Sequence, residues 1–225
     1  LIATQGYTSQ AVAANYEHAL RRSSELNDRD QDIPIHVLYG LWGTCLVRGD
    51  REATDELARH FQRVEESPDP LARHVAHSTL GARAFYHGDF TRAMQHCRQA
   101  MEIYAPAHHF VLMRDYGYEG AIYSHSYVAC ILCFTGFPDH ALVVVDEAHR
   151  LSQSVGDPYS NATSLCFAAC IARERREPER AMALADELIA LSTERQFIMW
   201  LGIAHCLRGW SRVAMNDIAG GAEEI

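Results

Sequence analysis

The chain has 225 residues and a formal net charge of −9, and its 20 basic residues are all arginine. A P-loop uses a lysine to reach the nucleotide phosphates, so a sequence without lysine excludes that kind of ATP site. The acidic balance argues against direct binding of nucleic acid, because such binding depends on neutralising phosphates. The length allows a substantial buried core.

The cysteines and the apolar runs bear on location. Seven cysteines, an odd number, are scattered through apolar stretches and do not follow the spacing of a disulfide framework. We therefore expect a reducing compartment and a cytoplasmic location. The longest apolar run, Tyr127 to Phe134, is less than half the roughly 18 residues of a membrane span, so no membrane association is expected. The chain starts without methionine and ends within a repeat, which indicates a piece of a longer protein.

A helix–turn–helix pattern recurs along the chain. Its clearest copy, residues 80–100, has Leu-Gly within one helix, a Gly-Asp turn, and then Ala93 and Ala100 on the next helix. Small residues at such positions let two helices approach closely. Anchor alanines mark the copies at a spacing of about 40 residues, with one gap nearer about 48, against roughly 34 for the commonest tetratricopeptide unit. The anchors are Ala11, Ala53, Ala93, Ala141, Ala181 and Ala222.

Helical periodicity dominates between these anchors, and no convincing strand or hairpin signal is present. The sequence therefore predicts an all-α fold, a right-handed solenoid of stacked antiparallel helix pairs that is tetratricopeptide-like. Each pair would bury its apolar face against its neighbours. We expect a single domain over residues 1–225. Its approximate repeats are 1–31, 32–68, 69–118, 119–156, 157–195 and a truncated 196–225.

The stretch ALVVVDEAHRL, Ala141 to Leu151, invites a different interpretation. An apolar run that ends in Asp-Glu-Ala-His is how many helicases present their metal-binding carboxylates. The repeat pattern instead places Ala148 at a helix-packing position, with Asp146 and Glu147 on the outward side of a helix. Because no lysine-bearing loop accompanies it, this stretch does not predict an ATP-driven motor.

Several motifs in order carry a family resemblance over essentially the whole chain. They are QGYTSQAVAANYEHALRRSSEL, YGLWGTCLVRGD, AHSTLGARAFYHGDF, TGFPDHAL, DPYSNATSLCFAA and CLRGWSRVA. This succession resembles the C-terminal tetratricopeptide-like region of bacterial STAND-type signalling ATPases, including nucleotide-cyclase-associated ATPases. The sequence departs from the family pattern at GYEG (Gly117 to Gly120), where Gly-Gln-Asp-Pro is usual, and at Asp157-Pro158, where His-Pro is usual.

The resemblance implies a non-enzymatic interaction and sensor module with no cofactor. The ATPase and any cyclase would lie outside this chain, so no catalytic residue carries over. The partner would be a protein or peptide segment, and it could belong to the parent protein's own ATPase domain. Two alternatives stay open. One is small-molecule effector sensing in the same groove, and the other is self-association as a homodimer through the exposed end near Ala222.

In tetratricopeptide arrays the first helix of each pair lines a concave groove. Carried over to this sequence, that geometry gives a floor that suits an amphipathic helix or an extended peptide better than a highly charged tail. The alternative is that these residues bury one another. The groove-binding candidates are Leu38, Trp42, Ser78, Phe85, Tyr123, Ser126 and Arg173.

The segment Ala105 to Gly120 breaks the period and is rich in histidine, arginine and tyrosine. Long connecting segments are either functional or mobile. This one is either a lid that folds over the groove or an extended helix end. The lid residues would be His108, His109, Arg114 and Tyr118.

No metal site or enzyme is predicted. Cys130 with Cys133, and Cys166 with Cys170, could each share a helix face, but they lack the loop context of a zinc site. His74 and His77 share a face without a neighbouring carboxylate. His125 stands between Ser124 and Ser126, but sequence neighbours on a helix point to different sides, so no nucleophile and base are brought together.

Overall fold

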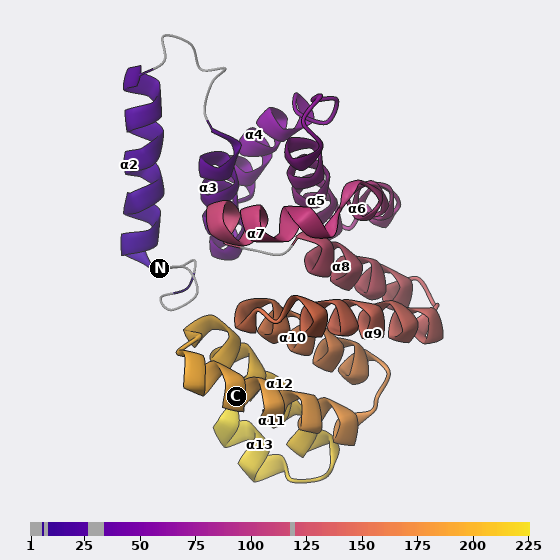
Figure 1. The fold of residues 1–225 in the computed structure, drawn as a ribbon. Coiled ribbons are helices and arrows are strands. Elements are labelled where there is room, and N and C mark those ends of the chain that lie inside the picture. The colour runs from indigo at the N-terminus through magenta and orange to yellow at the C-terminus, as the bar shows by residue number, and fades with distance from the viewer. Residues whose placement is uncertain (1–5, 7–8, 27–33, 118–119) are drawn as a thin grey trace. The chain divides into compact units, whose positions relative to one another are not determined.

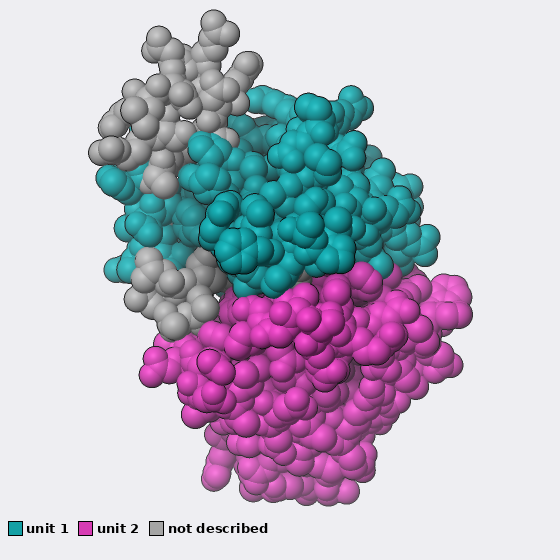
Figure 2. Space-filling model, viewed as in Figure 1, with its two compact units in different colours: residues 1–120 teal, residues 121–225 magenta. Residues whose placement is uncertain are grey.

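The computed structural model describes residues 6, 9–26, 34–117 and 120–225. Every regular element within these ranges is helical, which confirms the all-α prediction. No helix in them is long and apolar enough to cross a membrane. The chain forms two compact units, residues 1–120 and 121–225, coloured separately in Figure 2. We call them the N-terminal unit and the C-terminal unit and describe each by itself.

The N-terminal unit consists of helices that pack against their neighbours in sequence (Figure 1). They are α2 (Gln10–Leu26), α3 (Ile35–Arg48), α4 (Arg51–Gln62), α5 (Pro70–Tyr86) and α6 (Phe90–Ile103), followed by three short consecutive helical segments, η1 (Pro106–His108), α7 (His109–Val111) and η2 (Leu112–Tyr116). Each helix from α2 to α6 contacts the next one. Neighbour-on-neighbour packing of this kind is the pattern of a helical repeat.

The C-terminal unit continues in the same way. Its helices are α8 (Gly120–Phe134), α9 (Pro138–Val155), α10 (Pro158–Glu174), α11 (Pro178–Arg195), α12 (Ile198–Ala214) and α13 (Ile218–Glu224). From α9 onward each helix contacts the next, and α10 also contacts α12. The first helices of two successive pairs therefore touch, as stacked helix pairs require.

Capped turns separate the helices. Gly88 follows α5 with φ of 76°, a left-handed conformation that glycine adopts without strain. The carboxylate of Asp89 then accepts a hydrogen bond from the backbone N–H of Arg92 at 3.1 Å, which caps the start of α6. Pro138 stands in the first turn of α9, where a missing N–H costs little. The Gly-Asp turn and Pro138 occupy the positions predicted from the sequence.

Small residues stand where neighbouring helices meet. The predicted anchors Ala93, Ala141 and Ala181 are fully buried. A Cβ added to Gly81 on α5 would lie 2.7 Å from the Sγ atom of Cys97 on α6. These two helices are therefore too close to admit a larger residue at that position, which confirms the predicted role of the small residues.

The anchors predicted at Ala11, Ala53 and Ala222 are wrong by one residue. The residues buried in their place are the adjacent Val12, Thr54 and Gly221. In each of these three pairs, both residues are small or apolar enough to fit the repeat pattern of the sequence. The phase of the helix decides which of them points at the neighbouring helix, because successive residues differ by about 100° around the axis.

The Asp-Glu-Ala-His stretch lies within α9, not at the end of a strand. Ala148 is fully buried, and Asp146 and Glu147 are exposed. The Asp146 carboxylate pairs with Arg180 at 3.2 Å, and Glu147 pairs with Arg150 at 3.9 Å. The helical interpretation of this stretch is confirmed.

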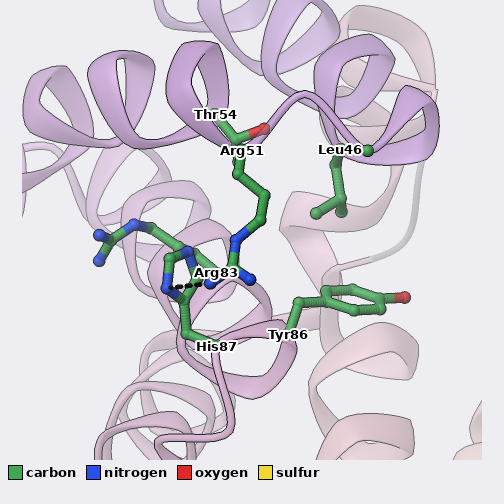
Figure 3. Close-up of a pocket in the computed structure, with 7 residues that line it drawn as sticks. Leu46, Arg51, Thr54, Arg83, Tyr86 and His87 are labelled. Carbon is green, nitrogen blue, oxygen red and sulfur yellow. Dashed lines mark hydrogen bonds between the residues drawn. The ribbon is translucent and has the colours of Figure 1, made fainter.

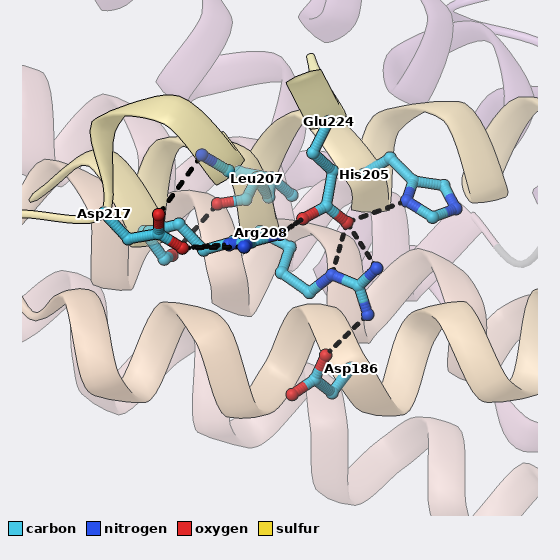
Figure 4. Close-up of polar contacts among 9 residues, drawn as sticks. Asp186, His205, Leu207, Arg208, Asp217 and Glu224 are labelled. Carbon is cyan, nitrogen blue, oxygen red and sulfur yellow. Dashed lines mark hydrogen bonds and ion pairs between the residues drawn. The ribbon is translucent and has the colours of Figure 1, made fainter. Parts of the chain in front are cut away.

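Polar contacts hold α13 against α12 (Figure 4). The Glu224 side chain is only 7% exposed, and its carboxylate accepts hydrogen bonds from His205 Nδ1 at 2.9 Å, from Arg212 at 3.3 Å and from Arg208. Arg208 also reaches Asp186 on α11 at 3.0 Å. Burial raises the pKa of Glu224, but the three donors outweigh burial, so the net pKa is lowered.

Candidate functional site

In the N-terminal unit most of the predicted groove residues belong to the core. Leu38, Trp42 and Ser78 are buried, and only Phe85 is partly exposed. The Trp42 ring lies 6.2 Å from that of Tyr39 on the same helix. These side chains therefore fill the interior of their unit, as the alternative of mutual burial predicted for them.

In the C-terminal unit the predicted groove residues divide in the same way. Ser126 is fully buried and donates its hydroxyl to the carbonyl of Ile122 at 2.7 Å. Tyr123 is partly exposed, with its ring 6.2 Å from that of Phe167. Arg173 is partly exposed and pairs with Glu174 at 2.6 Å. Tyr123 and Arg173 stay accessible to a partner.

The segment predicted as a lid or a helix extension folds back on α3. Helix α6 ends at Ile103, and the three short helical segments follow it. Leu112 is fully buried, and the ring of Tyr116 lies 6.0 Å from that of Tyr39 on α3. Leu112 and Tyr116 therefore belong to the core of the N-terminal unit, and the segment is a separate helical stretch that does not continue α6.

Three of the four predicted lid residues lie in the described part of the chain. Arg114 is exposed and pairs with the neighbouring Asp115. His108 accepts a hydrogen bond at Nδ1 from the backbone N–H of Ala105 at 3.2 Å, and His109 is partly exposed. Tyr118 lies outside the described residues. Closure of this segment over a groove stays a prediction.

The turn edge of the N-terminal unit carries a pocket of about 220 Å³ (Figure 3). We call it the α3–α5 pocket, because it lies between the end of α3, the start of α4 and the end of α5. Its lining residues are Leu46, Gly49, Arg51, Thr54, Arg83, Tyr86 and His87. Tyr86 is 55% exposed and Val47, next to Leu46, is 43% exposed, so apolar surface reaches solvent beside the pocket.

The charges of the α3–α5 pocket are only partly compensated. Asp55 pairs with Arg83 at 2.7 Å and with His87 Nε2 at 3.0 Å. Burial raises the pKa of Asp55, but Arg83 and His87 outweigh it, and the net pKa is lowered. Arg51 lies 3.3 Å from His87 Nδ1 and has no carboxylate within 4 Å among the described residues. The pocket therefore offers one uncompensated guanidinium beside an apolar patch.

The hydrogen bonds assign a tautomer to neutral His87. Arg51 can only donate, so the Nδ1 atom of His87 accepts. The proton of the ring is then on Nε2, which donates to Asp55. His87 thus links the guanidinium of Arg51 to the carboxylate of Asp55 and fixes the orientation of the pocket wall.

Sequence reasoning missed this pocket, although it named the adjacent Phe85. Phe85 packs against Phe90 with ring centroids 5.8 Å apart, whereas Tyr86 points toward the pocket (Figure 3). The available signal was the pair of Gly-Asp turns at residues 49–50 and 88–89. Equivalent turns of successive repeats lie on one edge of an array, so residues that flank them gather there.

His125 and Ser126 each hydrogen-bond to a carbonyl of their own helix. His125 Nδ1 donates to the carbonyl of Ala121 at 2.7 Å, and Ser126 bonds to its own helix, so the two do not engage each other. Burial raises the pKa of the Cys130 thiol. Among the described residues, the one group of potential metal ligands contains no cysteine.

Comparisons with known proteins bear on the fold. A scan against protein-family models finds no match, and a search of curated proteins finds none. A search of solved structures finds a crystal structure of BtubC (BKLC) from P. vanneervenii, with a TM-score of 0.63, 14% sequence identity and coverage of 96% of this chain and 87% of that one. This likeness shows a helical repeat-like fold.

Proposed function

We propose that this chain is a non-enzymatic interaction and sensor module that binds a protein segment and belongs to a bacterial STAND-type signalling ATPase. The family resemblance of its motifs and its helical repeat-like fold support this role. The bound segment could come from the parent protein's own ATPase domain. Binding would act by a population shift, in which the partner prefers one state of the module.

The observation that carries the proposal is the uncompensated Arg51 beside the exposed ring of Tyr86 in the α3–α5 pocket. Tyrosine and arginine dominate the energetic centres of protein interfaces. A pocket of about 220 Å³ accepts one apolar side chain, with Leu46 and Tyr86 as walls. The guanidinium of Arg51 would pair with a carboxylate next to that side chain. The segment bound is therefore an apolar anchor followed or preceded by Asp or Glu.

Small-molecule sensing is the second candidate function. Ligand pockets usually enclose about 300–1,000 Å³. The α3–α5 pocket is smaller than that range, and a second cavity of about 320 Å³ beside Glu65 lies at its lower end. Self-association has its own observation, because Val213 on α12, Ile218 on α13 and Ile225 directly after α13 expose apolar side chains. Light scattering tests it, since an Ile218→Asp variant would shift a dimer to monomer.

The test of partner binding uses exposed side chains, because replacing buried Trp42 would disturb the core. The native chain and an Arg51→Ala/Tyr86→Ala variant are used to retain proteins from the source organism's lysate, and the retained protein is then titrated directly. Arg98→Ala/Phe110→Ala is the matched control, since both residues are exposed in the same unit.

Removing two anchoring side chains should weaken the measured affinity at least about 30-fold, which corresponds to about 2 kcal/mol. The control variant should bind within about 2-fold of the native chain. Equal affinities for the pocket variant and the control would refute the assignment of the α3–α5 pocket as the binding site. Circular dichroism first establishes that all three proteins are equally helical.

A further inference from the structure

Three potential metal ligands meet in the N-terminal unit, away from the α3–α5 pocket. Glu65 lies in the connection between α4 and α5, His77 on α5 and His96 on α6. Their ligand atoms all lie within 4.8 Å of one another. Helices α5 and α6 pack side by side (Figure 1), so two helices and the turn before them supply the three groups.

The spacing of the two histidines suits coordination of one ion. The Nδ1 atoms of His77 and His96 are 3.1 Å apart. Two nitrogens bound to tetrahedral zinc at about 2.05 Å are about 3.3 Å from each other. A direct N–H···N hydrogen bond would also account for the histidine pair, but it gives no role to the carboxylate of Glu65. An ion shared by all three groups accounts for the whole cluster.

Burial and neighbouring charges act on the cluster. Burial, followed by the proximity of His96, lowers the pKa of His77 to about 4, and burial also lowers the pKa of His96. Arg73 on α5 and Arg92 on α6 oppose a cation here, and the carboxylates of Glu65 and Glu102 offset them.

A cavity beside the cluster leaves room for a further ligand. It measures about 320 Å³, and Glu65, His77 and Glu102 are among its lining residues. Sites with three protein ligands and an open fourth position hold zinc with a water molecule or an outside group. The two histidines and one carboxylate are such a set.

We propose that Glu65, His77 and His96 form a binding site for a divalent transition-metal ion of the zinc class. The premise that His74 and His77 have no carboxylate nearby is wrong for His77, because the turn before α5 brings Glu65 to it. His74 is not part of the site, since its Nδ1 atom donates to the carbonyl of Ala100 at 2.8 Å. The bound ion ties the α4–α5 connection to α5 and α6.

The experiment titrates the full chain, with any affinity tag removed, with Zn²⁺ by calorimetry and with Co²⁺ by visible absorption. His77 is buried, so the deciding variants are Glu65→Gln and His96→Gln at partly exposed positions. His140→Ala, an exposed histidine in the C-terminal unit, is the matched control.

One equivalent of Co²⁺ should give the intense visible bands of a tetrahedral site, and Zn²⁺ should displace it. Removing a residue that only hydrogen-bonds to a metal ligand weakens metal binding about 10–100-fold. Glu65→Gln and His96→Gln each remove a ligand itself, so each should weaken binding by about 100-fold or more. His140→Ala should leave the affinity unchanged. Absence of stoichiometric binding to the native chain would overturn the proposal, as would equal affinity in the deciding variants and the control.

Discussion

Replacing Leu112 by alanine should destabilise the N-terminal unit by about 3 kcal/mol. Leu112 is fully buried, in the η2 segment that packs on α3. The change removes three carbon atoms, each worth about 0.8 kcal/mol of transfer free energy, and leaves a cavity that adds to the loss. A destabilisation of this size is expected only if the segment after α6 is part of the buried core.

Phe110 provides the matched control two residues earlier in the same segment. Its side chain is 70% exposed, and the guanidinium of Arg114 lies 5.9 Å from the centroid of its ring. Phe110→Ala should change the free energy of unfolding by no more than about 0.5 kcal/mol, as is usual for exposed positions.

Urea unfolding followed by circular dichroism measures the two variants, and hydrogen exchange of the α3 amides locates the effect. A loss of 3 kcal/mol should speed exchange in α3 roughly 100-fold or more. If Leu112→Ala and Phe110→Ala differ by less than about 0.5 kcal/mol, or if exchange in α3 is unchanged, the reasoning that η2 packs on α3 fails. A mobile lid would then be the better description of the segment.

Three further predictions concern the C-terminal unit. The pKa of Glu224 is lowered in the fold, so its network stabilises α13 fully above the unfolded pKa, and this stabilisation is lost as pH falls through the folded pKa. Protection of the α13 amides, corrected for the intrinsic exchange rate at each pH, should therefore fall on acidification, and Glu224→Gln should remove this loss of protection. Ala141→Leu should cost about 1–3 kcal/mol in urea unfolding by overpacking a fully buried position, whereas Ala222→Leu at an exposed one should cost less than about 0.5 kcal/mol. Asp146→Ala removes an exposed ion pair and should cost at most about 1 kcal/mol; any ATP hydrolysis by the purified chain that this variant abolished would contradict the helical interpretation of the Asp-Glu-Ala-His stretch.

Sequence reasoning missed the lining of the pocket and the proposed metal ligands for a common reason. Arg51 and Tyr86, like Glu65 and His96, come from different helices or from the turns between them. Their meeting depends on how neighbouring helices are packed, and the periodicity of one helix carries no information about that. Burial also depends on packing, since Trp42 and Ser126 share helix faces with partly exposed residues but lie inside their units.

The sequence by itself determined the helical class and the main turns. Helical periodicity, capping aspartates such as Asp89 and prolines such as Pro138 act within a few residues of the chain, so they can be recognised without knowing the packing. Only the tertiary structure decided that Gly221, and not Ala222, faces α12, and that Leu112 belongs to the core. Both depend on contacts between helices, where a change of about 100° in direction separates a buried residue from its exposed neighbour.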